Sequence, residues 1–97
     1  MKRSIFEKYA KAVSIKFSIT LEEMYTKDNH ENVVDARYFL YYLCVERPIK
    51  ISHISQFMLD NGLKVYRTTI KYGYNKAKKM IDSDSDYKRL VQEITNE

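Results

Sequence analysis

The order of hydrophobic and polar positions along this chain predicts helices. Over residues 5–17, apolar side chains recur at three- and four-residue spacing and share one helix face: Phe6, Tyr9, Ala10, Val13 and Phe17. Ser4 and Glu7 have the spacing of a capping box at the start of this helix. Ile15, Phe17 and Ile19 also alternate, which leaves a short strand there as the alternative.

A second and a third helix are expected to follow. A short helix over residues 21–25 opens with Thr20 and Glu23, a second capping pattern, and the polar stretch 26–32 is predicted to be a loop. Asn32 is placed to cap the next helix, over 33–47, and Pro48 to end it. The buried face of this helix is predicted to hold Ala36, Phe39, Leu40, Leu43 and Cys44.

The second half of the chain predicts three more helices. A short one over 53–60 has Ser52 as its cap and Gly62 as its left-handed end. A long one over 64–81 packs through Ile70, Gly73, Tyr74, Ala77 and Met80 or Ile81. Gly73 weakens a helix interior by about 1 kcal/mol relative to alanine, so we expect a neighbouring helix to approach closely there. Ser83 or Ser85 caps the last helix, whose inward residues are Tyr87, Leu90, Val91 and Ile94.

These elements predict one all-α domain of about six helices over residues 1–97. A length of 97 residues suits one domain, and two glycines with one proline are too few for the turns of an all-β chain. The single cysteine, Cys44, lies in an apolar run and is expected in the core. Neither a signal segment nor an apolar run of the roughly 18 residues that span a membrane is visible, so we expect a soluble cytoplasmic protein, in a bacterial cell or in the host cell of a virus.

The basic charge is concentrated in one segment. The formal net charge is +4, yet residues 61–81 hold six cations and no acid, whereas eleven basic and thirteen acidic residues elsewhere give −2. Ordinary solvated helix faces mix charges of both signs. The asymmetry therefore points to an anionic partner at this segment.

A short helix, a turn with glycine and a longer basic helix follow the order of a helix-turn-helix. Residues 53–60 would form the buttress helix and residues 64–81 the recognition helix. Side chains able to read base edges, or to bind nearby phosphates, are Arg67, Thr68, Thr69, Lys71 and Asn75. Tyr66 and Tyr72 flank this surface and could stack or bind phosphate, and further phosphate contacts are expected from Arg37, Lys64, Lys76, Lys78 and Lys79.

The stretch 13–94 resembles the C-terminal DNA-binding domain (domain IV) of the bacterial replication initiator DnaA, in the Trp-repressor-like helix-turn-helix group. VSIKFSITLEEMY at 13–25 resembles its opening helices, VVDARYFLYYL at 33–43 its arginine-bearing helix, and ISHISQFM at 51–58 its buttress helix. RTTI at 67–70 is similar to the His-Thr-Thr-Val signature of the recognition helix, and Tyr87, Leu90, Val91 and Ile94 match the last helix. The resemblance implies this fold and a duplex-DNA-binding face.

The chain also departs from that family. Tyr66 and Arg67 stand where the family has Asp-His, and the family's basic loop is replaced by 27–31, with one lysine and two acids. The turn at 59–65 is about four residues longer than the family's. No nucleotide-hydrolysing domain is visible, so we expect a stand-alone accessory protein of DNA replication or transcription regulation, such as a phage protein.

The alternative is a protein-interaction module derived from such a domain, with weak or no DNA binding. The acidic loop at 28–31 and the tyrosines Tyr38, Tyr41 and Tyr42 motivate it, since tyrosine is favoured at protein interfaces, including those of homodimers. His30, Cys44 and His53 lack the paired spacing of metal ligands. With no nucleophile motif or phosphate loop, we expect no enzyme activity, no cofactor, no metal, no small-molecule substrate and no membrane partner.

Overall fold

The computed structural model describes residues 2–96, and this part of the chain folds into six helices without a strand. The helices are α1 (Lys2–Lys16), α2 (Leu21–Met24), α3 (Glu31–Glu46), α4 (Ile51–Asp60), α5 (Arg67–Ser83) and α6 (Ser85–Thr95). The all-helical class is therefore confirmed, and the alternative of a strand at Ile15–Ile19 is wrong. Phe17 instead turns inward, and its ring lies 5.4 Å from that of Phe39 on α3.

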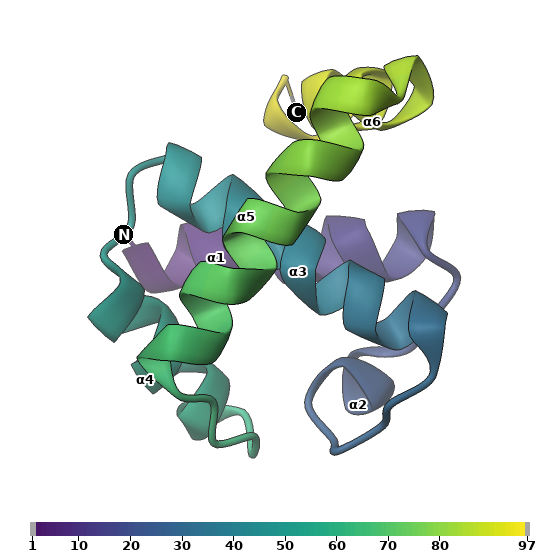
Figure 1. Ribbon diagram of the computed structural model, residues 1–97. Coiled ribbons are helices and arrows are strands. Elements are labelled where there is room, and N and C mark those ends of the chain that lie inside the picture. Colours follow the sequence, from purple (N-terminus) through teal and green to yellow (C-terminus); the bar gives the residue numbers. More distant parts are fainter. Residues whose placement is uncertain (1, 97) are drawn as a thin grey trace.

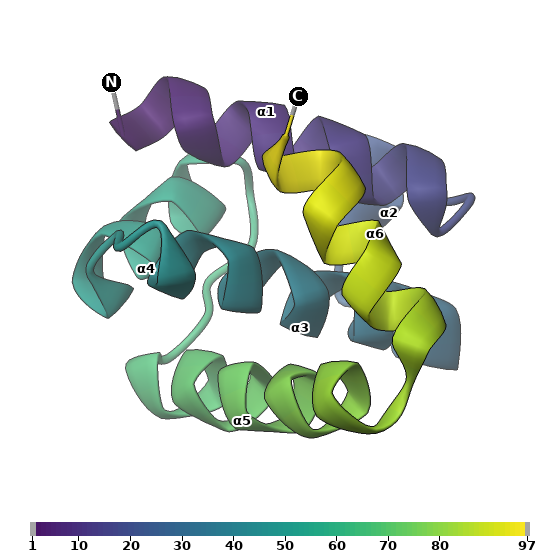
Figure 2. The ribbon, with the colours of Figure 1, turned by 90° about the horizontal axis from the view of Figure 1, so that it is seen from above.

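The central element is α3, which lies between α1 on one side and α5 on the other (Figures 1 and 2). Such a position requires apolar side chains around most of the helix, because two opposite faces lose contact with water. Eight of its sixteen residues are buried, namely Val33, Ala36, Arg37, Phe39, Leu40, Tyr41, Leu43 and Cys44. Cys44 is 0% exposed, as expected of a core residue.

Two helices complete the fold at its edges. Against α1 lies α4, where the rings of Phe6 and Phe57 are 5.3 Å apart and Arg3 bonds Asp60 at 2.7 Å. The last helix, α6, crosses from the end of α5 back to α1 and buries Ile94 completely (Figure 2). None of the helices described here is long and apolar enough to cross a bilayer.

Several predicted helix ends are confirmed. The hydroxyl of Thr20 accepts from the Glu23 amide at 3.0 Å, while the Glu23 carboxylate accepts from the Thr20 amide at 2.9 Å, a complete capping box. Pro48 lies two residues beyond the end of α3, and Gly62 follows α4 with φ +107°. Such a φ favours glycine, because a side chain there would clash with its own backbone.

Other predicted caps are wrong. Ser4 and Asn32 lie inside helices, since α1 is described from Lys2 and His30 is the residue before α3. Ser52 is inside α4, whose flanking residue is Lys50, and α6 is capped by Asp84 rather than by Ser83 or Ser85. The long basic helix begins at Arg67 instead of residue 64, because Leu63 and Val65 are buried in an extended connector.

Candidate nucleic-acid interface

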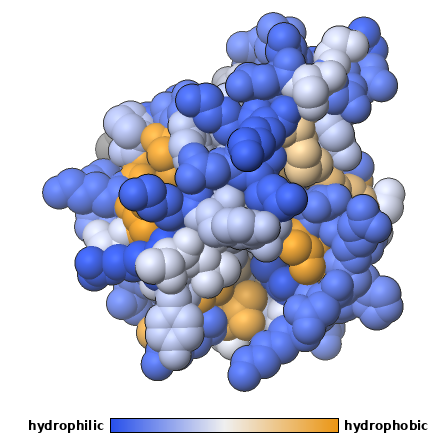
Figure 3. Space-filling view, viewed as in Figure 1, coloured by the Kyte–Doolittle hydropathy of each residue, from blue (hydrophilic) through white to orange (hydrophobic). Residues whose placement is uncertain are grey.

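The inner face of α5 is apolar and packs on α3. Ile70, Gly73, Ala77 and Ile81 are buried there, and Tyr74 and Met80 are half-buried, as the spacing predicts. All ten candidate DNA contacts in 64–79 are exposed: Lys64, Arg67, Thr68, Thr69, Lys71, Tyr72, Asn75, Lys76, Lys78 and Lys79. In the space-filling view of this side, the surface along α5 is mainly hydrophilic (Figure 3). One helix therefore separates a packing face from a basic, solvated face.

The outermost ridge of α5 is uncharged except at its end. Thr68, Tyr72, Asn75 and Lys79 are four, three and four residues apart, which stacks them along one line of the helix, opposite the buried line of Ile70, Ala77 and Ile81. Tyr72 is 56% exposed. Hydroxyls, an amide and a phenol are groups that hydrogen-bond base edges, so this ridge has the chemistry to enter a groove.

Cations flank the ridge on both sides, but in different settings. On one side, Arg67, Lys71 and Lys78 are exposed, and none of them has an ion-pair partner among the described residues. On the other side, Lys76 and Lys79 line a hollow of about 480 Å³ together with Asp35 and Glu31 of α3. Desolvation and then Glu31 raise the pKa of Asp35, while Lys76 opposes this rise. Asp82 follows Lys78 by four residues on α5 and faces the same way, so Arg67 and Lys71 are the cations of the first side without an acid beside them on the helix.

Gly73 allows α5 to lie close to α3. A Cβ atom at Gly73 would come 2.4 Å from Cδ1 of Tyr38 and 2.9 Å from Cδ2 of Tyr41. Real Cβ atoms essentially never approach that closely, so only glycine fits this crossing without a shift of the rings. The expected close approach at Gly73 is thus confirmed. The ring of Tyr38 also packs edge-to-face against the exposed ring of Tyr72, with the ring centres 6.0 Å apart.

The connector between α4 and α5 fixes where the basic helix starts. Leu63 donates its amide to the Met58 carbonyl at 3.0 Å and Gly62 donates to Leu59 at 2.9 Å, the two bonds of a Schellman motif. Leu63 and Val65 then point inward while Lys64 and Tyr66 point outward, and the Ser55 hydroxyl donates to the Val65 carbonyl at 2.7 Å. These contacts hold the first turn of α5 against α4.

The first turn of α5 offers free backbone donors. Tyr66 is the flanking residue and forms no side-chain cap, while the amides of Thr69 and Ile70 both bond its carbonyl. The amides of Arg67 and Thr68 precede the first intrahelical bonds and point out of the helix end, which carries the positive end of the helix dipole. With Lys64 and Arg67 beside it, this turn suits a phosphate.

Arg37 does not belong to this exposed surface, contrary to its predicted phosphate role. It is 8% exposed, and its guanidinium bonds four backbone carbonyls: Met24 and Asp28, each at 2.8 Å, Glu23 at 3.2 Å, and Thr26. Burial lowers its pKa, although a guanidinium stays charged at neutral pH. Arg37 therefore fixes the 24–28 segment to α3. The sequence prediction failed here because an arginine that binds backbone carbonyls and an arginine that binds phosphate can occupy the same position in a helix, and the sequence does not distinguish them.

The tyrosines of α3, which the sequence predicts as a homodimer or partner surface, lie largely within the contact between helices. Tyr41 is 1% exposed, and Tyr38 is half-buried against Gly73 and Tyr72. Tyr42 stacks on Tyr74 with ring centres 5.6 Å apart. All three rings thus serve the contact between α3 and α5. The exposed tyrosines are instead Tyr66 and Tyr72, at 65% and 56%.

The acidic loop before α3 is internally bonded. Asp28 accepts from the His30 amide at 2.9 Å and contacts the His30 ring at 2.5 Å. The backbone bond and then the side-chain bond to His30 lower the pKa of Asp28, and the same side-chain bond raises the pKa of His30. Cys44 is buried in the core whereas His30 is exposed, and no group of three metal-binding side chains lies together in residues 2–96.

Comparisons with protein-family models, with curated proteins and with solved structures find no match to this chain. The candidate interface therefore rests on the residues and their geometry alone. Sequence reasoning placed its exposed residues correctly but missed a hollow beside it, lined by Lys27 and Tyr41 among others. No pattern in the sequence marks that hollow, because its walls come from three separate segments.

Proposed function

We propose that this protein binds duplex DNA, with α4 as the buttress helix and α5 as the recognition helix of a helix-turn-helix. The observation that carries the proposal is the separation of the two faces of α5. Its buried side holds only small and apolar residues, while its exposed side and Lys64 hold six cations over a stretch without an acid. Such a face attracts the phosphates of a nucleic acid.

In the proposed complex, the ridge of Thr68, Tyr72 and Asn75 faces the floor of the major groove. The groove is about 12 Å wide and admits one helix. Arg67, which starts the helix, reaches guanine edges or phosphate, and Thr69 binds a phosphate or base nearby. Lys71 and Lys78 contact the phosphates of one DNA strand, while Lys76 and Lys79 face the phosphates of the other strand.

We also propose kinship with the C-terminal DNA-binding domain of DnaA. The succession of a central helix, a short helix, a turn and a long basic helix supports this kinship. The role that fits is an accessory protein of DNA replication or transcription regulation, carried by a bacterium or a phage. A single recognition helix covers about one half-site, so tight specific binding would require two copies or a partner.

The test is fluorescence anisotropy with a random-sequence duplex over a salt series. With about six phosphate contacts, affinity should fall roughly a thousandfold between 50 and 200 mM salt. The double variant Arg67→Ala, Lys71→Ala should weaken binding and reduce the slope of log K against log salt by about two. The matched control is Lys2→Ala, Lys11→Ala, which removes the same charge from α1, on the far side of α3.

Two results would overturn this function. The first is normal binding by the Arg67→Ala, Lys71→Ala variant, because the proposed surface would then be the wrong one. The second is no binding at low salt, which would favour a fold devoted to protein partners.

A further inference from the structure

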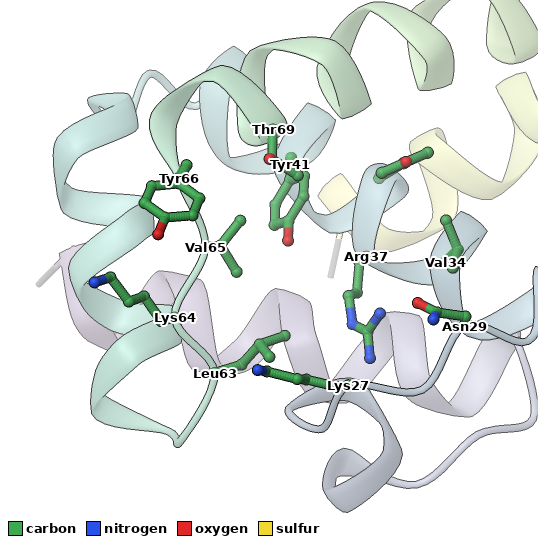
Figure 4. A pocket seen from close by; sticks show the side chains of 11 residues that line it. Lys27, Asn29, Val34, Arg37, Tyr41, Leu63, Lys64, Val65, Tyr66 and Thr69 are labelled. Carbon is green, nitrogen blue, oxygen red and sulfur yellow. The ribbon is translucent and has the colours of Figure 1, made fainter.

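A hollow of about 320 Å³ opens between α3, the loop at 27–29 and the connector that leads into α5 (Figure 4). Its walls are mainly the rings of Tyr38 and Tyr66 and the apolar side chains of Val34, Leu63 and Val65. This volume lies at the lower end of the range of ligand sites in proteins. It is separate from the outer ridge of α5, although Thr69 borders both.

The hollow is positively charged. Lys27 lines it from the loop at 27–29, and Lys64 lines it from the connector, with its ammonium 5.5 Å from the centre of the Tyr66 ring (Figure 4). No aspartate or glutamate lines it. The hollow therefore has two flexible cations at its mouth, and Asp28, which stands between its lining residues Lys27 and Asn29, does not line it.

A third positive charge lies deeper. Arg37 borders the hollow, is 8% exposed and bonds only backbone carbonyls, and no carboxylate of residues 2–96 forms an ion pair with it. Carbonyl oxygens satisfy its N–H groups, and the carboxylate of Asp28 favours its charged form without forming an ion pair with it. An anion bound in the hollow would add a further favourable interaction with this buried charge.

The Tyr41 hydroxyl supplies an unused polar group. The side chain is 1% exposed, its oxygen points into the hollow between Val65 and Arg37 (Figure 4), and it has no hydrogen-bond partner among the described residues. The hydroxyl oxygen is not among the fully buried unpaired polar atoms of residues 2–96, where His53 Nδ1 is the one found, so it is accessible from the hollow. This hydroxyl is therefore placed to donate to a ligand.

We propose that this hollow binds a nucleotide, with the base against the tyrosine rings and Val65 and the phosphate at Lys27 and Lys64. Aromatic rings stack bases of any sequence, and two lysines with a nearby guanidinium suit a phosphate. A free mononucleotide and an unpaired nucleotide of a DNA strand present the same chemistry. The site does not depend on the outer ridge of α5, so it stands or fails separately from duplex binding.

The first experiment is an NMR titration of the whole protein with each of the four deoxynucleoside monophosphates. We expect sub-millimolar binding, with amide shifts confined to Lys27, Asn29, Tyr66, Thr69 and their neighbours. Inorganic phosphate and the nucleosides without phosphate should each bind at least about tenfold more weakly, because each carries half of the contacts.

Variants test the two groups that the geometry singles out. Tyr41→Phe keeps the ring and removes only the hydroxyl, and should weaken nucleotide binding by about tenfold. Lys27→Ala, on an exposed loop, should weaken it by about fivefold. Tyr42→Phe and Lys11→Ala are the matched controls and should bind as the parent does, with circular dichroism verifying that every variant is folded.

A second comparison identifies the source of the nucleotide. A duplex with a one-nucleotide overhang that displaces the mononucleotide better than a blunt duplex points to a DNA strand, and equal displacement points to a free nucleotide. The proposal is overturned if no mononucleotide shifts these amides at about 5 mM, a concentration well above the sub-millimolar dissociation constant expected. It is also overturned if Tyr41→Phe binds unchanged, or if phosphate alone binds as tightly as the nucleotides. Blunt-duplex binding that depends on Arg67 and Lys71 would survive any of these failures.

Discussion

Gly73 of α5 lies directly against the Tyr38 ring of α3, and a Cβ atom at position 73 would be 2.4 Å from Cδ1 of that ring. The same Cβ atom would lie 2.9 Å from Cδ2 of the Tyr41 ring. Tyr41 is 1% exposed, so a movement of its ring would disturb the side chains packed around it in the core. The distance of the basic helix from the core is thus determined at one residue.

Gly73→Ala should therefore destabilise the protein. Alanine improves helix propensity by about 1 kcal/mol, but overpacking a tight contact costs about 1–3 kcal/mol. We expect a net loss of about 1 kcal/mol in the free energy of unfolding, measured by urea denaturation. Tyr38→Ala should relieve much of this loss in the double variant, because it removes the nearer ring. A Gly73→Ala protein more stable than the parent would show that the two rings move aside freely.

Arg37→Lys tests whether this side chain holds the fold. Lysine keeps the charge but has one nitrogen, which cannot reach the four carbonyls that the guanidinium bonds. The carbonyls left without a partner should lower the free energy of unfolding by about 2–4 kcal/mol. Arg47→Lys, at an exposed position after α3, is the control and should change little. An unchanged stability together with weaker DNA binding would restore the phosphate role predicted from the sequence.

The sequence specified the helices well because their apolar spacing reflects burial. The inward residues of α5, from Ile70 to Ile81, are those that the spacing predicts. Helix starts were harder, since a cap depends on how the chain enters. Thr20 is correct because both partners of its capping box lie within four residues. Ser4 fails because α1 already includes Lys2 and Arg3, and Arg3 contacts Asp60 and Phe57 far along the chain.

The candidate site shows the same division. Exposure on α5 follows from local periodicity, so Lys71 and Asn75 could be placed from sequence. The role of Arg37 depends on carbonyls 9 to 14 residues away, and the packing of Tyr42 depends on Tyr74, 32 residues later. Neither long-range contact leaves a pattern in the sequence. Arg37 and Tyr42 have side chains that suit an interface, so the sequence alone predicted that they belong to an interface.

The pair of Asp28 and His30 should make a small, pH-dependent contribution to stability. The pKa of Asp28 is lowered from 3.8, so its contribution is present above pH 3.8 and is lost as the pH falls. The pKa of His30 is raised from 6.5, so its contribution is full below pH 6.5 and is lost as the pH rises through the folded-state value. Both groups contribute fully between these two values. In Asp28→Asn, an NMR titration of the His30 ring should show a lower pKa than in the parent. An unchanged value would mean that the contact does not persist in solution.

The carboxylates of α3 should weaken the proposed DNA surface on one side. Asp35 and Glu31 share a hollow with Lys76 and Lys79, whereas no acid lies within four residues of Lys71 on α5 and Lys71 forms no ion pair with a described residue. A phosphate near Lys76 would meet the negative charge of Asp35 as well as the lysine, so Lys76→Ala should reduce duplex affinity less than Lys71→Ala does.

Asp35→Asn should do the opposite and strengthen duplex binding by a few fold at 50 mM salt, with a smaller gain at 200 mM because salt screens the removed repulsion. Anisotropy titrations of the three variants at both salt concentrations provide the measurement. Asp86→Asn removes the same charge from exposed α6 and is the matched control. If Lys76→Ala and Lys71→Ala lose equal affinity and Asp35→Asn gains none, DNA does not approach α5 from both sides of its ridge, and the groove orientation proposed for this helix is wrong.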